Sequence, residues 1–401
     1  MTQSSAPSSD LPLAGVRVVA LEQAVAAPLA TRHLADLGAE VVKVERLGEG
    51  DFARAYDASV KGLASHFVWL NRGKESIALD LKSAEGRALV LRLIDDADVF
   101  VQNLAPGAAD RLGLDVETLT TRNPRLIAVG LTGYGTSGPR RDRKAYDMLV
   151  QAESGLVSIT GTPHEATKTG IPTSDIAAGM YVFSSVLSAL YRRERTGLGA
   201  VIDVSMFDAT VEWLGHPMYV QLYEDRQIPR MGLSHAAIAP YDAFPTTDGQ
   251  VLIGIQNDRG WRLLCEQVFG DPQLALDPRF VTNVDRVGHR HELDAAVAER
   301  TRRMTTAELE QALATAGVAA AQINDMSGLV EHPQLSERDR WREVGTEVGP
   351  VRAVLPPMNF RDVELAMGDV PALGQHTSDV LSRLGLSDDE IGTLRERQTV
   401  Q

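Results

Sequence analysis

The stretch GVRVVALEQAVAAPLATRHLADLGAEVVKVE, residues 15–45, decides the fold class of this chain. It starts with a short β-branched run, residues 15–22, which predicts a buried strand. Helical spacing of apolar residues follows and ends at Gly38, and residues 41–45 form a second short strand pattern. A strand–helix–strand unit joins parallel strands, so we expect an open α/β sheet with ligands at the carboxyl ends of its strands.

The same alternation continues along the chain. Ser83 is a plausible N-cap for a helical segment that extends to residue 97. Further strands are predicted at residues 98–104, 125–135 and 201–206, and the last of these runs into a helix that ends near Trp213.

From about residue 240 the pattern changes. A hairpin is predicted to turn at Asp248 and Gly249, and polar helices follow it. We therefore predict a disordered tail and two domains: residues 1–10 for the tail, 11–225 with 335–401 for a large domain, and 226–334 for a smaller α+β domain.

Composition limits the classes of function. The chain has 401 residues and a formal net charge of -14, which disfavours binding to nucleic acids and anionic membranes. Its single cysteine, Cys265, excludes an internal disulfide and a cysteine-based zinc cluster, in keeping with the cytoplasm. The start of the sequence does not resemble a secretory signal, and the apolar segment 176–197 is interpreted as a buried core helix.

The sequence gives no support to three common kinds of functional site. The glycine pattern at residues 133–138 fits a dinucleotide fingerprint in spacing, but Pro139 and five charged residues follow where a helix is required. His289 and His291 lie two apart, so on a helix they do not share a face and do not predict a metal site. The chain has no G-x-S-x-G nucleophile motif.

Asp175, in TGIPTSDIAAGM (residues 169–180), has two interpretations. An aspartate at the start of a helix often serves only as its cap. The same position suits a catalytic carboxylate, because a helix N-terminus can stabilise negative charge and the small residues after it leave room for a ligand. Basic residues near the expected strand ends could line a phosphate site: Arg46, Arg72, Lys74, Arg111 and Lys144.

An ordered set of motifs runs along the chain from about Leu13 to its end: PLAGVRVVALEQ, LADLGAEVVKVERLGEGDFAR, LNRGKESIALDLKSAEGRALVLRLIDDADVFVQNLAPGAADRLGL, RKAYDMLVQAESGLVSITG, GIPTSDIAAGMYVFSSVLSALYRRERTGLGAVIDVSMFDA and LGQHTSDVLSRLGLS. In these motifs the chain resembles the family III CoA-transferases, which also include α-methylacyl-CoA racemases. The resemblance implies a Rossmann-like large domain for CoA and an interlocked, ring-like homodimer, with the active site between the large domain of one subunit and the small domain of the other.

The resemblance also implies that Asp175 is the nucleophile. Its carboxylate attacks an acyl-CoA thioester to give an aspartyl anhydride, and the freed CoA then forms an aspartyl-CoA thioester that the acceptor acid attacks. Covalent catalysis of this kind divides one difficult exchange into easier steps. No metal and no permanently bound cofactor are implied, since the coenzyme A thioester is itself a substrate.

Further residues follow from matched motifs. Six fall where the family contacts CoA: Arg46, Asn103, Leu104, Arg111, Leu112 and Lys144. Five are expected to support the active site: Val25, Tyr146, Asp147, Gly232 and His235. Racemases carry a histidine where this chain has Tyr146, and a tyrosine side chain is poorly suited to shuttle protons at neutral pH. This difference favours transfer over racemisation. Formyl-CoA transferases carry a glutamine at the position of Val25 and a longer glycine run where this chain has the loop 232–238. Both departures argue against oxalate and formate as the substrates.

The preferred function is transfer of CoA from a donor such as succinyl-CoA to a C4 or C5 dicarboxylate, whose distal carboxylate could meet Arg54, Arg72 or His235. Carnitine-like and aromatic acids remain open as acceptors. The alternatives are a 2-methylacyl-CoA racemase and a non-catalytic acyl-CoA-binding protein.

Overall fold

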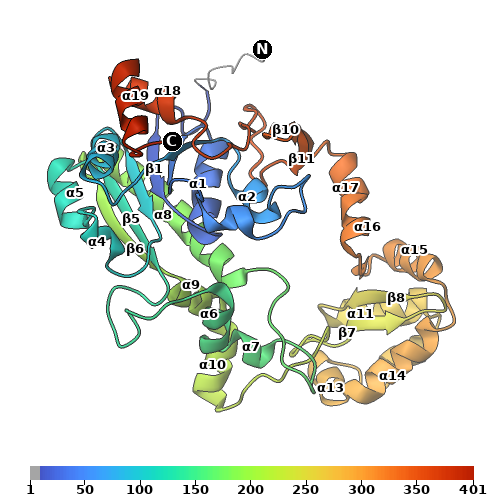
Figure 1. Ribbon diagram of the computed structural model, residues 1–401. Helices are drawn as coiled ribbons and strands as arrows, with labels where there is room; N and C mark the ends of the chain where they lie inside the picture. Colours follow the sequence, from blue (N-terminus) through green and yellow to red (C-terminus); the bar gives the residue numbers. More distant parts are fainter. Residues whose placement is uncertain (1–9) are drawn as a thin grey trace. The chain divides into compact units, whose positions relative to one another are not determined.

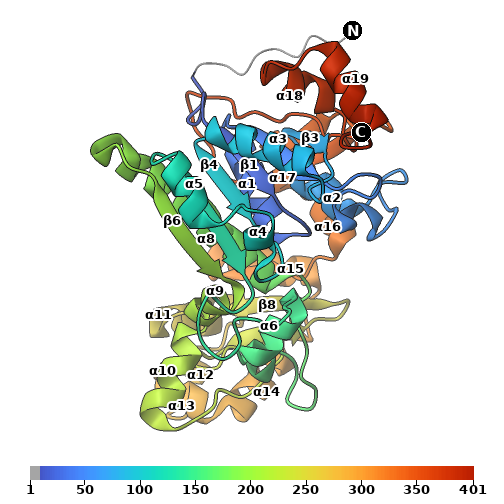
Figure 2. The ribbon, with the colours of Figure 1, turned by 60° about the vertical axis from the view of Figure 1, so that its left-hand side comes forward.

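The computed structural model describes residues 10–401, which form two compact units (Figures 1 and 2). Nearly all of the predicted tail 1–10 therefore lies outside the described residues. The first unit contains the chain up to Leu156 together with Thr169–His216 and Asp339–Gln401, and the second contains Val157–Lys168 and Pro217–Arg338. The boundaries predicted from the sequence instead assign residues 157–168, 217–225 and 335–338 to the large domain.

The first unit is built on a six-stranded parallel sheet, which confirms the predicted α/β class. The strand order is β3-β2-β1-β4-β5-β6, so the direction of winding reverses between β1 and β4. The bounds are Arg17–Leu21 for β1, Glu40–Glu45 for β2, Lys74–Ala78 for β3, Val99–Gln102 for β4, Ile127–Thr132 for β5 and Ala200–Ser205 for β6.

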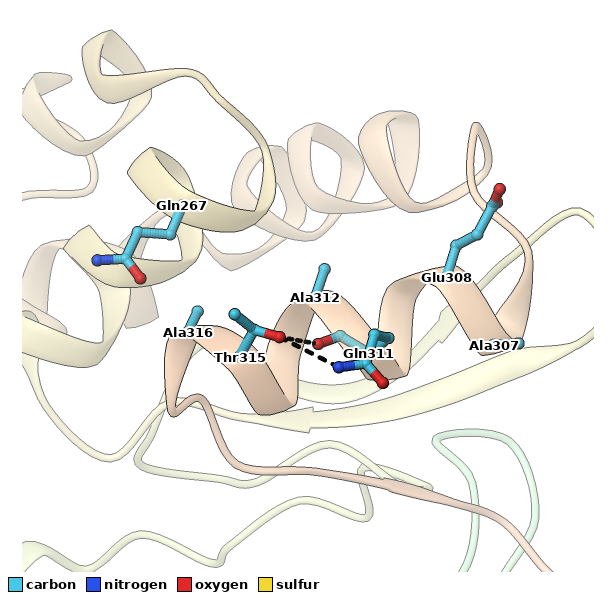
Figure 3. Close-up of a pocket in the computed structure, with 7 residues that line it drawn as sticks. All are labelled: Gln267, Ala307, Glu308, Gln311, Ala312, Thr315 and Ala316. Atoms are coloured by element: carbon cyan, nitrogen blue, oxygen red, sulfur yellow. Dashed lines mark hydrogen bonds between the residues drawn. The ribbon is translucent and has the colours of Figure 1, made fainter.

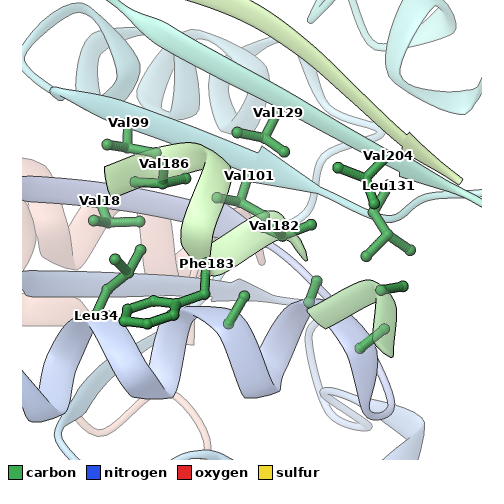
Figure 4. Packing of buried hydrophobic residues seen from close by; sticks show 14 of the residues in the cluster. Val18, Leu34, Val99, Val101, Val129, Leu131, Val182, Phe183, Val186 and Val204 are labelled. Atoms are coloured by element: carbon green, nitrogen blue, oxygen red, sulfur yellow. The ribbon is translucent and has the colours of Figure 1, made fainter. Parts of the chain in front are cut away.

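Helices cover both faces of this sheet. On one face, Val182 and Val186 of α8 and Leu34 of α1 lie against Val99 and Val101 of β4 (Figure 4). The helices of this layer are α1 (Ala26–Asp36), α8 (Thr173–Thr196) and α9 (Met206–Trp213), with α6 (Asp147–Glu153) beside α8 and α9. Segment 176–197 thus lies almost wholly in a core helix, and no helix within residues 10–401 is long and apolar enough to cross a membrane.

The opposite face is covered partly by the C-terminal end of the chain. Leu89 of α3, Leu119 of α5 and Leu381 of α18 pack in one cluster with Phe100 of β4. This layer contains α3 (Ala84–Asp95), α5 (Val116–Arg122), α18 (Thr377–Arg383) and α19 (Asp388–Glu396). The predicted N-cap Ser83 is confirmed, because its hydroxyl accepts a hydrogen bond from the N–H of Gly86 at 2.9 Å.

Smaller elements complete the first unit. They are the 3₁₀-helix η1 (Phe52–Ala55), α2 (Ser65–Leu70), α4 (Ala108–Arg111) and the antiparallel pair β10 (Trp341–Val344) and β11 (Val351–Val354). Two helices lie across the boundaries of the units: α7 (Leu156–Ile159) and α10 (Gly215–Glu224). The glycine pattern 133–138 follows β5, but residues 139–146 are not helical, which agrees with its rejection as a dinucleotide site.

The second unit contains the predicted hairpin, β7 (Tyr241–Pro245) and β8 (Gln250–Gly254), extended by β9 (Ala320–Gln322) into an antiparallel sheet. Its helices are α11 (Asp258–Leu263), continued by a π-helical turn at Leu264–Val268, α12 (Pro272–Leu276), α13 (Asn283–Gly288), α14 (Arg290–Thr301), α15 (Thr306–Ala316), α16 (Met326–Val330) and α17 (Pro333–Ser336). His289 and His291 are both exposed, and residues 10–401 contain no group of three potential metal ligands.

Gly179 allows α8 to approach α1 closely. A Cβ atom at this position would lie 2.5 Å from the carbonyl oxygen of Ala26 and 3.2 Å from Leu29 Cδ2. We expect Gly179→Ala to destabilise the first unit, because overpacking of about 1–3 kcal/mol exceeds the gain of about 1 kcal/mol that alanine brings to a helix. Urea unfolding would measure the change.

Gly392→Ala is the matched control for this substitution. Gly392 lies in α19, and nothing within 4 Å would meet its added Cβ. This variant should gain up to about 1 kcal/mol from helix propensity. If Gly179→Ala stabilised the protein as well, the close approach of α8 to α1 would not limit the side chain at position 179.

Candidate active site

The candidate site lies in the first unit, at the carboxyl ends of β1 and β4. Asn103, just after β4, is bonded to the loop that follows β1: its Oδ1 accepts from the N–H of Gln23 at 2.9 Å, and its Nδ2 donates to the Gln23 carbonyl at 2.8 Å. The amide of Asn103 thus links the ends of β1 and β4, the two neighbouring strands between which the direction of winding reverses. Ligands of open α/β sheets bind at this kind of position.

Asp147 caps the helix that carries Asp175. Pro172 precedes α8 and offers no capping side chain. Asp147 Oδ1 accepts instead from the N–H groups of Ser174 and Asp175, at 2.8 and 3.2 Å. Because Asp147 performs this function from the start of α6, the carboxylate of Asp175 is not needed as a cap.

The two neighbouring N–H groups at the start of α8 are also occupied. Thr173 donates to the carbonyl of Ile171 at 2.8 Å, and Ile176 donates to that of Pro172 at 2.9 Å. The expectation that this helix end holds developing negative charge is therefore wrong in one respect: its first N–H groups are already bonded within the protein.

Gln151 orients Asp147. It lies one helical turn further along α6, is fully buried, and donates from Nε2 to Asp147 Oδ2 at 2.6 Å. Its Oε1 accepts from the N–H of Thr169 at 3.1 Å, so it also fixes the segment that leads into α8. Sequence reasoning missed this residue, although the i, i+4 spacing from Asp147 was a usable signal.

Asp175 is half-buried, and its carboxylate accepts no hydrogen bond from residues 10–401. Burial raises the pKa of this carboxyl, and the negative charge of Asp147 raises it further, to about 7. The group is thus a basic carboxylate that is ionised only in part at neutral pH. Such a perturbed carboxylate is typical of functional sites.

Tyr56 interacts electrostatically with Asp175 and with a second tyrosine, Tyr146. Burial raises the pKa of Tyr56 to about 12, with further contributions from Asp51, Asp175 and Tyr146. Tyr56 therefore keeps its proton at neutral pH and can act as a donor. Tyr146 immediately precedes α6, and 63% of its surface is exposed.

Val25 forms part of an apolar wall beside α8. It directly precedes α1, is 4% exposed, and packs with Leu29 and Leu70. Ala24 and Ile176, the residue after Asp175, pack against the same cluster. The structure therefore brings Val25, Asp147 and Asp175 together.

Three of the predicted CoA contacts are unpaired cations. Arg46, Arg111 and Lys144 are exposed, and within residues 10–401 none of their side chains has an ion pair or hydrogen bond. In a chain of net charge -14 these groups are available to phosphates. Leu104 and Leu112 instead pack partly buried against the cluster that includes α3.

Three other basic residues are not available, contrary to expectation. Arg72 is buried and pairs with Asp36 at 2.8 Å, and Arg54 pairs with Glu45 at 2.8 Å. Lys74 is buried and donates to Glu22 at 2.5 Å. The sequence places Arg72 and Lys74 near strand ends. It does not reveal that the three cations pair with carboxylates that lie 9, 36 and 52 residues earlier in the chain.

Gly232 and His235 lie in the second unit, so their placement relative to Asp175 stays a prediction. Gly232 has a φ of 65°. His235 Nδ1 accepts from the N–H of Ala237 at 3.1 Å, and its ring stacks on Tyr241 with centroids 5.4 Å apart. An accepting Nδ1 puts the ring proton on Nε2, which remains available as a donor.

Asp175 does not line either of two cavities in residues 10–401. The larger, about 550 Å³, lies along α15 and is lined by residues such as Gln267, Gln311 and Thr315 (Figure 3). The other, about 360 Å³, lies between α3 and α19. Their linings contain no nucleophile with an activating partner, so neither competes with Asp175 as a reaction site.

The chain is similar in sequence and structure to known proteins. The sequence model of CoA-transferase family III matches residues 13–377. The acetyl-CoA:oxalate CoA-transferase of Acetobacter aceti is 38% identical over 87% of this chain and 90% of that protein. The succinate–glutarate CoA-transferase of Agrobacterium fabrum is 36% identical over 94% of this chain and 97% of that protein. The crystal structure of a CAIB/BAIF family protein from Brucella suis matches with a TM-score of 0.82 at 36% identity, over 93% of this chain and 99% of that chain.

Proposed function

Because this chain belongs to CoA-transferase family III and is a CoA-transferase, we propose that Asp175 is its nucleophile and a small dicarboxylic acid its acceptor. The observation that carries the proposal is the carboxylate of Asp175. It is half-buried, has no hydrogen-bond donor within residues 10–401, and has its pKa raised to about 7 by burial and by Asp147. A more basic carboxylate is a stronger nucleophile once ionised.

The proposed reaction has four bond exchanges. An oxygen of Asp175 attacks the donor thioester, the carbon–sulfur bond breaks, and CoA leaves as a thiolate. The thiolate attacks the aspartyl carbonyl of the anhydride, which releases the donor acid. The acceptor carboxylate then displaces the thiolate, and the thiolate attacks the acceptor's carbonyl to give the new acyl-CoA and free Asp175. No net proton is consumed, and CoA held in place keeps its sulfur next to each intermediate.

The choice of a dicarboxylate acceptor rests on two observations. The relative from Agrobacterium fabrum is named a succinate–glutarate CoA-transferase. Of the three side chains expected to meet a distal carboxylate, Arg54 and Arg72 are held in ion pairs, whereas Nε2 of His235 is available. Oxalate is the second candidate acceptor, since the relative from Acetobacter aceti is named for it.

The test is to trap the aspartyl intermediate. After incubation with succinyl-CoA and then hydroxylamine or borohydride, mass spectrometry should locate a modification at Asp175. The same enzyme should then be offered glutarate, mesaconate, itaconate, methylsuccinate, citramalate, malate, oxalate and butyrate as acceptors. We expect the C4 and C5 dicarboxylates to be used best. Modification elsewhere would refute the assignment of Asp175, and preference for butyrate or oxalate would refute a C4 or C5 dicarboxylate as the acceptor.

We further propose an interlocked homodimer in the cytoplasm that needs no permanently bound cofactor. Family resemblance supports the dimer, and the single cysteine, Cys265, suits a reducing compartment. Light scattering should give twice the chain mass of 43.4 kDa. A monomer would contradict the proposal.

A further inference from the structure

Residues 22–25 form a short loop between β1 and α1, and this loop borders the start of α8. Its last residue, Val25, packs with Leu29 and Leu70, and Ile176 packs against the same cluster. Ile176 follows Asp175 directly in the chain. The loop is therefore a wall next to the proposed nucleophile, and its conformation decides what can reach that carboxylate.

Side chains from elsewhere fix the first two residues of the loop. Glu22 is 2% exposed, and its Oε1 accepts from Lys74 Nζ at 2.5 Å. Gln23 is held by two hydrogen bonds between its backbone and the amide of Asn103. These anchors come from β3 and from the end of β4, so the loop is attached to both halves of the sheet.

Ala24 is held in an unfavourable conformation. Its φ of 64° lies in the left-handed region, which costs a residue with a Cβ atom about 1–2 kcal/mol. Its N–H donates to Asp51 Oδ1 at 3.0 Å, and the same oxygen accepts from the N–H of Ala53 at 2.9 Å. Asp51 Oδ2 accepts from Lys43 Nζ at 2.8 Å. The strained residue is thus fixed by an aspartate that is itself fixed by a lysine.

The ion pair of Asp51 and Lys43 is completely buried, with both side chains at 0% exposure. Burial lowers the pKa of Lys43, but the carboxylates of Asp51 and Glu22 more than offset this, so that its pKa is raised and it stays charged. Buried ion pairs contribute little net stability compared with apolar side chains of the same size. A strained alanine in the loop next to the nucleophile, fixed by a buried ion pair, indicates a local functional requirement rather than a stabilising one.

We propose that Asp51 is a positioning residue of the transferase, which together with Lys43 holds loop 22–25 against the start of α8 and so keeps water from the intermediates on Asp175. This inference rests on the proposed aspartyl mechanism. If the loop opens, water attacks the carbonyl carbon of the anhydride or of the thioester. The carbon–oxygen or carbon–sulfur bond breaks, Asp175 is freed, and the donor thioester is hydrolysed instead of transferred.

The test compares two charge-balanced double variants. Both Asp51→Asn/Lys43→Met and Asp51→Ala/Lys43→Met remove the ion pair, but only the first retains an oxygen that can accept from the N–H of Ala24. The measured quantity is the ratio of free CoA released to new acyl-CoA formed, with succinyl-CoA and glutarate. We expect this ratio to be on the order of tenfold higher in the alanine variant than in the asparagine variant, because small displacements in an active site have large effects on the partitioning of intermediates.

Asp36→Asn/Arg72→Met is the matched control. It removes another buried ion pair from the same unit, at 2.8 Å, whose side chains have no hydrogen bond to loop 22–25. Its ratio of hydrolysis to transfer should equal that of the wild type. Equal ratios in the two Asp51 variants would overturn the proposal, and so would a raised ratio in the control.

Hydrogen exchange of the wild-type enzyme gives a test that does not depend on the folding of a variant. The N–H groups of Gln23 and Ala24 should exchange as slowly as those of β1, because both are bonded to fixed side chains. Fast exchange of these groups in the folded enzyme would overturn the proposal. If the wild type formed no aspartyl adduct and transferred no CoA, the proposed function itself would be refuted. Normal CoA transfer by the wild type, with equal ratios in the two Asp51 variants, would refute only the role of Asp51.

Discussion

Asp175→Ala and Asp175→Asn should abolish CoA transfer, with a loss on the order of 10³-fold or more, as expected when a covalent nucleophile is removed. Neither side chain can form an anhydride with the donor. The measurement is formation of new acyl-CoA from succinyl-CoA and glutarate, together with mass spectrometry of the incubated protein. Alanine is needed beside asparagine because an asparagine at this position can regain activity by deamidation.

Asp388→Asn is the control for a carboxylate in the first turn of a helix. Asp388 begins α19, on the face of the sheet opposite to α8, and is exposed. This variant should transfer CoA at the wild-type rate. Transfer by Asp175→Ala within tenfold of the wild type would show that the reaction does not pass through Asp175, and the chain would then have to use another nucleophile.

Asp175→Asn should lower the activity of the protein without lowering its stability. The folded pKa of Asp175 is about 7, whereas an unfolded aspartate titrates near ~4. Between these values the folded state binds more protons than the unfolded state, so this group makes the protein less stable as pH rises from ~4 to about 7. Above that window, Asp175→Asn should therefore melt at the same or a higher temperature than the wild type, which would confirm that lost activity is not lost folding.

The sequence predicts the sheet well because its signals are local. The first two strands and the helix between them lie in one continuous segment, residues 15–45. The N-cap Ser83 directly precedes the helix that it begins. The position of Asp175 at the start of a helix was also predictable from the proline and threonine before it. What the sequence does not reveal is how far apart in the chain the partners of a charged group lie.

Charge pairing explains the main errors about the site. Arg72 was a candidate for an anionic ligand, yet it pairs with Asp36 at the end of α1. The cap of α8 comes from Asp147, 27 residues before Ser174. One such pair did leave a signal: Lys43 is a charged residue inside the apolar run VVKVE, and a charge in a strand buried on both faces requires a partner of opposite charge.

Asp147→Asn should move the acid limb of the pH profile to lower pH. The free wild-type enzyme should gain activity as Asp175 ionises, so kcat/KM should rise through a limb near pH 7. Removing the negative charge of Asp147 lowers the pKa of Asp175, because part of its elevation is like-charge repulsion. The amide retains an oxygen for the N–H groups of Ser174 and Asp175, so α8 keeps its cap.

Two further variants separate the charge of Asp147 from its bonds. Gln151→Met removes the hydrogen bond to Asp147 Oδ2 but leaves its charge, so the acid limb should stay where it is in the wild type. Asp147→Ala removes both charge and cap, and kcat/KM should fall by on the order of 10²-fold, because the start of α8 and the carboxylate on it are no longer held in place. An acid limb that stays near pH 7 in Asp147→Asn would mean that burial alone sets the pKa of Asp175. In that case Asp147 would act on the nucleophile only through the two hydrogen bonds that position it.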